Sequence, residues 1–288
     1  MKHLSLFIEV TRLTKPIGFM LLFWPCVWGL TLAYNFENDL NLYFFYLLLF
    51  FLGSVLMRSA GCIVNDIFDK DFDKKVSRTK NRPIASGKIS IKLASIYSCI
   101  LCLIALLVLL NFNYFTIILA LGSMPLAFTY PLMKRFTYWP QLFLGVTFNY
   151  GLILGWTSIN NDIGLAPIVF YLGAIFWTLG YDTIYGYQDI IDDEIIGLKS
   201  TSIKFKKNAK NFLFSCYFIL IMVLILGGYL MNFNLSYYLF LSILCLHLFF
   251  FQLRIFDIKN SSKCLLAFKS NNLFGLLVLI CILIGKNF

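Results

Sequence analysis

LYFFYLLLFFLGSVLMRSAGCIVNDIFDKDFD, residues 42–73, is an apolar stretch that ends in a cluster of acidic side chains. Residues 42–64 contain a single charged side chain, Arg58, and are long enough to cross a bilayer as a helix, which takes about 20 residues. A run of polar side chains follows at once: Asn65, Asp66, Asp69, Asp71 and Asp73. This pattern predicts a membrane-spanning helix that carries a polar cluster to the edge of the bilayer.

The rest of the chain has the same apolar character. Of its 288 residues, 60% are hydrophobic and 13% are charged, whereas soluble domains are about half apolar and a quarter charged. The composition predicts an all-α, polytopic membrane bundle and excludes a disordered chain, a coiled coil and a disulfide scaffold. We expect a single integral-membrane domain over residues 1–288 with nine spans, at 17–34, 42–64, 93–110, 115–131, 140–159, 164–184, 212–230, 235–253 and 270–285.

The positive charges fall on one side of this layout. Of the 24 Lys and Arg residues, 23 lie at the N-terminus or around the connections after the second, fourth, sixth and eighth spans, and only Lys286 lies on the other side. Because Lys and Arg collect in cytoplasmic loops, we expect a cytoplasmic N-terminus. The net charge of +10 then faces anionic lipid and an anionic substrate, so no nucleic-acid partner is expected.

The targeting signals are weak. The first apolar run lacks a cleavage pattern, and no long Arg- and Ser-rich presequence precedes it. We therefore expect a multi-pass protein of a bacterial inner (plasma) membrane, with the acidic clusters on its cytoplasmic side.

A second acidic cluster lies at the end of the sixth predicted span, in YDTIYGYQDIIDDE (Tyr181–Glu194). Asp189 and Asp193 are four residues apart, as are Asn65, Asp69 and Asp73, so each set shares one face if its helix continues. Clusters of oxygen ligands without His or Cys favour Mg²⁺, which takes one or two carboxylates and binds substrate phosphates with the rest of its shell. Two such clusters facing each other across a cavity would form a diphosphate site.

The alternative interpretation is that these carboxylates are solvated loop charges. Acidic residues contribute little to membrane topology. An ionised Asp at the bilayer centre costs about 2.5–3.5 kcal/mol, so carboxylates near a membrane tend to be functional. Among the nearby basic residues, Arg58 and Arg82 are candidates to bind phosphate or carboxylate through a bidentate fork, and Lys199 follows the second cluster.

Taken together, these motifs resemble the UbiA superfamily of membrane prenyltransferases. The resemblance rests on N-D-x-x-D-x-x-x-D (Asn65–Asp73), R-T-K-N-R-P-I-A-S-G (Arg78–Gly87), D-x-x-x-D (Asp189–Asp193) and G-L-K-S-T (Gly197–Thr201). Four further stretches resemble the subgroup that prenylates 4-hydroxybenzoate: T-K-P-I-G with L-F-W-P (Thr14–Pro25), M-R-S-A-G-C-I-V-N-D (Met57–Asp66), Y-P-L-M-K-R-F-T-Y-W-P-Q (Tyr130–Gln141) and Y-D-T-I-Y (Tyr181–Tyr185).

The resemblance implies nine helices around a central cavity, Mg²⁺ as cofactor, and polyprenyl diphosphate and 4-hydroxybenzoate as substrates, in membrane lipid and without an obligate protein partner. It implies the metal ligands Asp66, Asp69, Asp73, Asp189 and Asp193, and all but Asp66 are expected to be catalytic. Asn65 and Asp66 are expected to bind substrate. Arg135 matches the family arginine that is proposed to meet the carboxylate of the aromatic acid. Where the family often has V-D-R-D-D-D, this chain has Q-D-I-I-D-D (Gln188–Asp193).

The chemistry fits these residue types. An allylic diphosphate ionises when Mg²⁺ and Arg or Lys neutralise the departing charge, and the ring carbon ortho to the phenol then attacks. Two alternatives stay open: a sister prenyltransferase that uses a naphthoate, homogentisate or haem acceptor, and a cation transporter. A transporter more often places its acids near the midplane on broken helices.

Overall fold

A computed structural model describes residues 2–286, and its regular elements over that range are all helical. Two short elements, η1 and η2, are 3₁₀ helices, and η3 is a π-helical segment. In chain order the elements are α1 (Lys2–Thr11), α2 (Ile17–Ala33), α3 (Leu40–Phe68), α4 (Lys70–Asp73), α5 (Ile91–Leu109), α6 (Tyr114–Gly122), α7 (Met124–Thr129), η1 (Tyr130–Arg135), α8 (Pro140–Asn160), α9 (Leu165–Gly186), α10 (Ile190–Ile196), α11 (Thr201–Lys204), η2 (Lys206–Asn208), α12 (Ala209–Leu230), α13 (Leu235–Cys245), η3 (Leu246–Gln252), α14 (Leu253–Ile255), α15 (Ser261–Lys269) and α16 (Asn271–Gly285).

Eight helical stretches within residues 2–286 are long and apolar enough to cross a membrane. They are Leu40–Phe68, Ile91–Leu109, Tyr114–Arg135, Pro140–Asn160, Leu165–Gly186, Lys206–Leu230, Leu235–Ile255 and Ser261–Gly285. The first predicted span corresponds to α2, which is apolar but has 17 residues and is shorter than the others. The all-helical membrane fold is confirmed. The count of nine spans and the cytoplasmic N-terminus stay predictions.

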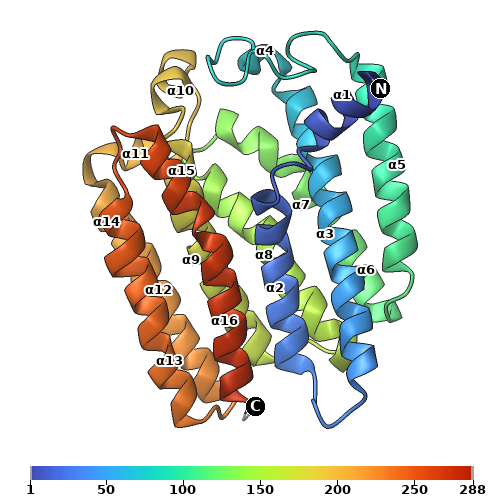
Figure 1. The fold of residues 1–288 in the computed structure, drawn as a ribbon, viewed down its shortest axis with the longest axis vertical. Helices are drawn as coiled ribbons and strands as arrows, with labels where there is room; N and C mark the ends of the chain where they lie inside the picture. Colours follow the sequence, from blue (N-terminus) through green and yellow to red (C-terminus); the bar gives the residue numbers. More distant parts are fainter. Residues whose placement is uncertain (1, 287–288) are drawn as a thin grey trace.

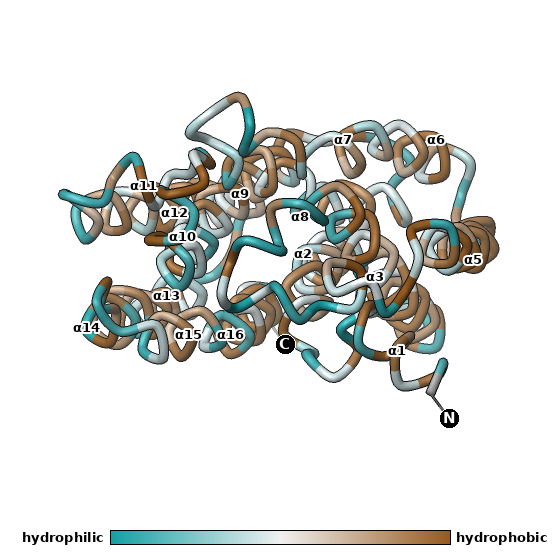
Figure 2. Tube along the Cα trace, turned by 90° about the horizontal axis from the view of Figure 1, so that it is seen from above, coloured by the Kyte–Doolittle hydropathy of each residue, from teal (hydrophilic) through white to brown (hydrophobic). Residues whose placement is uncertain are grey.

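The long helices run side by side, and their connections gather at the two ends of the bundle (Figure 1). The short helices α1, α4 and α10 lie at the end that holds the N-terminus, and the C-terminal end of α16 lies at the opposite end. Seen from above, the loops are largely hydrophilic and the long helices largely hydrophobic (Figure 2). Both acidic clusters therefore lie at one end of the bundle, on the same side as the N-terminus.

The length of α3 explains why its acidic residues reach the membrane edge. Asp39 caps its first turn by accepting a hydrogen bond of 2.9 Å from the backbone N–H of Asn41. With 29 residues the helix is about 43 Å long, which exceeds the roughly 30 Å of the hydrocarbon core. The last turns of α3 thus extend beyond the apolar layer.

A close crossing of α2 and α8 builds the middle of the bundle. Gly151 and Gly155 form a G-x-x-x-G pattern on α8, which lets helix backbones approach closely in a membrane. A Cβ atom added at Gly29 would lie 1.9 Å from the carbonyl oxygen of Leu152, and one at Gly155 would lie 2.2 Å from that of Cys26. Any larger residue at Gly29 or Gly155 would therefore force the two helices apart.

The last helix is tied to α2 and α9 through indole groups. Trp24 Nε1 donates to Asn272 Oδ1 at 2.9 Å, and Trp177 Nε1 donates to Asn271 Oδ1 at 2.8 Å. Asn271 is fully buried. These bonds bring α16 against α2 and α9, so the last helix takes part in the central structure.

Lys286, the one basic residue on the far side of the predicted topology, caps the C-terminal end of α2. Its Nζ donates to the carbonyl oxygens of Thr31 (3.0 Å), Leu32 (2.9 Å) and Tyr34. Replacing it by Met should lower the free energy of unfolding by about 1–3 kcal/mol, because a charged donor to several carbonyls is lost. Thermal unfolding in detergent measures this change, and the exposed Lys210→Met is the matched control. Equal melting temperatures for both variants would show that the cap contributes nothing.

Candidate active site

A cavity of about 970 Å³ lies among α2, α3, α9 and the junction of α15 and α16. Residues of both acidic clusters line it, although more than a hundred positions separate them in the chain. Of the site residues predicted from the sequence, those that line the cavity are Arg58, Asn65, Asp66, Asp69, Asp73, Arg82, Asp189, Asp193 and Lys199.

The first cluster sits where one helix breaks and another begins. α3 ends at Phe68, Asp69 has a non-helical backbone (φ −93°, ψ 2°), and α4 restarts at Lys70. The hydrogen bonds from the N–H of Asp69 to the carbonyl of Asn65 (2.9 Å) and from the N–H of Asp73 to that of Asp69 (2.8 Å) continue across the break. The four-residue spacing thus still holds Asn65, Asp69 and Asp73 to one wall, although α3 itself does not continue.

Three carboxylates of this cluster are buried. Asp66 and Asp69 are each 2% exposed and Asp73 is 7% exposed. Burial raises the pKa of Asp69 above its ordinary value, and Lys134 opposes that shift. Such carboxylates need cationic partners to stay ionised.

The second cluster repeats this geometry at the end of α9. The helix ends at Gly186, Asp189 precedes α10, and the N–H of Asp193 donates to the carbonyl of Asp189 at 2.9 Å. Burial, together with the negative charge of Asp189, raises the pKa of Asp193 to about 6. Both clusters therefore use a helix break to turn two carboxylates toward the cavity.

Four cations balance the carboxylates. Arg82 Nη1 lies 3.1 Å from Asp66 Oδ1 and 2.8 Å from Asp73 Oδ2. Lys134 pairs with Asp69, and Arg12 pairs with Asp66. A bidentate pair joins Arg78 to Asp189, with Nε 2.7 Å from Oδ1.

Three of these cations were not among the predicted site residues. Arg78 belongs to the R-T-K-N-R-P motif, so the motif offered a signal for it. Lys134 is adjacent in the sequence to Arg135, which was the predicted site residue. For Arg12 no local signal exists, because it lies 54 positions from Asp66 and reaches it only through the packing of α1 against α3.

Arg135 does not line the cavity, contrary to expectation. Its side chain is exposed, Nη2 donates to the carbonyl of Phe68 at 2.7 Å, and its guanidinium carbon lies 5.2 Å from the centre of the Phe72 ring. Lys134 and Arg135 are neighbours in the 3₁₀ turn η1, where successive side chains point about 120° apart. Lys134 therefore faces the cavity and Arg135 faces away.

The inner part of the cavity holds a cation without a carboxylate partner. Arg58 Nη1 contacts Cys62 Sγ at 2.9 Å, while its Nε is buried and makes no hydrogen bond. Its guanidinium carbon lies 5.6 Å from the centre of the Phe148 ring. A half-buried guanidinium with a buried, unused Nε–H beside an aromatic ring suits a planar carboxylate.

The donor set suits Mg²⁺. Oδ1 of Asp69 is buried without a hydrogen-bond partner, and carboxylate side chains of both acidic clusters line the cavity. Within residues 2–286, no three His, Cys, Asp or Glu side chains converge on one point as a closed metal site. Mg²⁺ needs only one or two carboxylates when substrate phosphates and water complete its shell, so these residues fit it.

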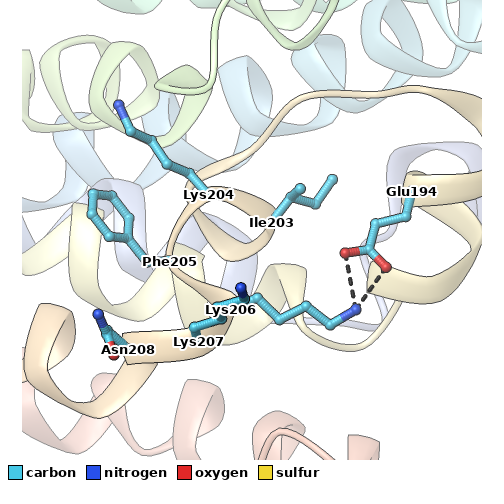
Figure 3. A pocket seen from close by; sticks show the side chains of 7 residues that line it. All are labelled: Glu194, Ile203, Lys204, Phe205, Lys206, Lys207 and Asn208. Atoms are coloured by element: carbon cyan, nitrogen blue, oxygen red, sulfur yellow. Dashed lines mark hydrogen bonds and ion pairs between the residues drawn. The ribbon is translucent and has the colours of Figure 1, made fainter.

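A smaller hollow lies on the surface beside α10 and α11 (Figure 3). Lys206 Nζ contacts both carboxylate oxygens of Glu194 there, at 2.9 and 2.7 Å. No predicted site residue lines this hollow, and we assign it no function.

Comparison with known proteins identifies the fold. Over 93% of this chain and 97% of the other, the structure superimposes on the apo structure of a UbiA homolog from Aeropyrum pernix K1 with a TM-score of 0.75 and 21% identity. A UbiA homolog from Archaeoglobus fulgidus bound to GPP and Mg²⁺ matches 98% of this chain and 100% of its own, with a TM-score of 0.73 and 15% identity. Residues 22–278 match the UbiA prenyltransferase family. The chain belongs to this family of membrane prenyltransferases.

Relatives with higher identity carry a more specific name. The chain is 42% identical to the mitochondrial 4-hydroxybenzoate polyprenyltransferase of Rattus norvegicus, over 99% of this chain and 76% of the relative. It is 40% identical to the enzyme of that name from Arabidopsis thaliana, over 98% of this chain and 69% of the relative.

These relatives also correct one expectation. The bacterial inner membrane predicted from the sequence is wrong, because the relatives are eukaryotic enzymes whose names place them in mitochondria. The prediction relied on the absence of a presequence, which is a weak signal for location. The multi-pass membrane character does not depend on it.

Proposed function

We propose that this protein transfers a polyprenyl group from polyprenyl diphosphate to the ring carbon ortho to the hydroxyl of 4-hydroxybenzoate, releasing diphosphate, as a step of ubiquinone biosynthesis. One observation carries the proposal: two Asp clusters distant in sequence line one cavity, together with four cations and Arg58, whose Nε is buried. The names of relatives with about 40% identity support the choice of acceptor.

The carboxylates bind the diphosphate through Mg²⁺ in this proposal. Asp66, Asp69 and Asp73 hold it from one wall, and Asp189 and Asp193 hold it from the other. Bound Mg²⁺ would neutralise charge on the leaving diphosphate and so favour cleavage of the allylic C–O bond.

The cations change partners when substrate enters. Without substrate, Arg78, Arg82 and Lys134 each pair with an Asp of the clusters. Once those carboxylates face Mg²⁺, the same cations are free to face phosphate oxygens, which Arg binds as readily as carboxylate. Asn65 and Lys199 line the same space and add donors. The exchange keeps Asp69, Asp73 and Asp189 next to a positive charge in both states.

The acceptor occupies the inner part of the cavity. Arg58 binds its carboxylate, because the buried Nε is unpaired and no acidic residue of the described range 2–286 forms an ion pair with it. The ring then lies against Phe148, which already packs on this guanidinium.

An assay of membranes that hold the full protein tests this function. With 4-hydroxybenzoate, a polyprenyl diphosphate and Mg²⁺, we expect prenylated 4-hydroxybenzoate by mass spectrometry. EDTA should abolish the product, and excess Mg²⁺ should restore it, because the carboxylates alone do not bind the diphosphate.

Two results would contradict the proposal. Product formation that is unchanged in EDTA would remove the metal from the reaction. Prenylation of a naphthoate, homogentisate or haem in place of 4-hydroxybenzoate would keep the enzyme class and change the acceptor.

A further inference from the structure

Asp182 is a carboxylate inside the membrane-spanning part of α9 that no predicted role uses. It lines the central cavity, as do Tyr185 and Asp189, three and seven residues further along the same helix. At 1.5 Å per residue, Asp182 lies about 6 Å before the end of α9 at Gly186, and Asp189 follows that end. Among residues 2–286 it has no ion pair or side-chain hydrogen bond, unlike Asp66, Asp69, Asp73 and Asp189. An ionised acidic residue at such depth costs free energy, so the acidic residues found there tend to serve a function.

Groups from three elements interact electrostatically with Asp182 in this cavity. The titratable or charged ones are Arg58 from α3, Tyr130 at the start of η1, and Tyr181 on α9 itself. All of them line the cavity, and Arg58 and Asp182 form no ion pair with each other. The inner cavity thus presents one cation and one separate carboxylate between aromatic side chains. This arrangement complements a ring that carries an acid group at one end and a hydroxyl at the other.

We infer that Asp182 accepts the hydrogen bond of the acceptor's phenol hydroxyl and takes its proton as the new carbon–carbon bond forms. This inference rests on the proposed function. A phenol with a pKa near 10 is almost entirely neutral at pH 7. The neutral ring is a weaker nucleophile than the phenolate, so a base at the hydroxyl raises the electron density at the ortho carbon.

The bonds broken and formed in this step account for every electron pair and proton. The allylic C–O bond breaks and its electron pair leaves with diphosphate. The ortho ring carbon supplies the pair for the new C–C bond, and the phenol proton moves to Asp182. The ring then loses the hydrogen of the bonded carbon as a proton, and Asp182 returns its proton to the oxygen. The net products are the prenylated phenol, diphosphate and one proton.

The test compares wild type with Asp182→Asn, which keeps the shape and loses the base. Removing a general base should lower kcat for 4-hydroxybenzoate by about 100-fold or more. The KM for polyprenyl diphosphate should stay near that of wild type, because the diphosphate ligands are intact. With 3-fluoro-4-hydroxybenzoate, whose hydroxyl is more acidic and ionises without a base more readily, the deficit relative to wild type should be smaller.

Matched variants separate this role from others. Asp189→Asn should lose activity with both acceptors alike, through weaker diphosphate binding. Asp182→Glu keeps a carboxylate and should retain more activity than Asp182→Asn. An Asp182→Asn enzyme with unchanged kcat, with an equal deficit for both acceptors, or without diphosphate binding would overturn the inference. A wild-type protein that prenylates neither acceptor would instead refute the proposed function.

Discussion

Asp69→Asn is expected to lower prenyl transfer by at least about 1,000-fold, since metal-assisted charge stabilisation is worth several kcal/mol and each 1.36 kcal/mol is a factor of ten in rate. Asp69 is almost fully buried, and its Oδ1 has no hydrogen-bond partner, so this oxygen is the one most available to Mg²⁺. Asn has nearly the same shape, and the protein should still insert and fold. Turnover with saturating substrates and Mg²⁺ measures the loss.

Asp71→Asn is the matched control for this prediction. Asp71 belongs to the same motif, yet its side chain is 87% exposed and pairs only with Lys74 at 3.3 Å. Its replacement should leave turnover near wild type. Equal losses for Asp69→Asn and Asp71→Asn would mean that the motif acts through its charge as a whole and not through the buried oxygen.

Arg58→Gln is expected to raise the KM for 4-hydroxybenzoate by about 10- to 100-fold, because a charge-assisted hydrogen bond worth about 1.5–3 kcal/mol is lost. The KM for polyprenyl diphosphate should change little. The structure gives Arg58 a buried, unpaired N–H in the cavity, whereas Arg135 lies outside it on the carbonyl of Phe68.

Arg135→Gln therefore serves as the comparison. Its acceptor KM should resemble that of wild type. If Arg135→Gln raised the acceptor KM and Arg58→Gln did not, the family-based role of Arg135 would hold and the acceptor would have to bind elsewhere. Steady-state kinetics with each substrate varied in turn distinguish the two results.

Most of the fold was accessible from the sequence, and the deviations have local causes. Each predicted span falls on an observed helix or on a continuous helical stretch of several elements, because a helix in lipid must satisfy its own backbone and so needs a long apolar run. The cavity residues of the two Asp motifs were likewise predictable, since their four-residue spacing survives the breaks at Asp69 and Asp189. The choice between Lys134 and Arg135 was not predictable, because a short 3₁₀ turn decides which of two neighbours faces inward.

The sequence by itself determined the membrane class, the helical spans and the sign of charge at each end of the bundle. These properties depend on the length of apolar runs and on the placement of Lys and Arg, which can be read along the chain. Only the tertiary structure decided that Arg12 pairs with Asp66, that Lys286 caps α2, and that Asp182 and Arg58 line the same cavity. Such pairs depend on the directions of side chains on different helices, and packing between those helices fixes them.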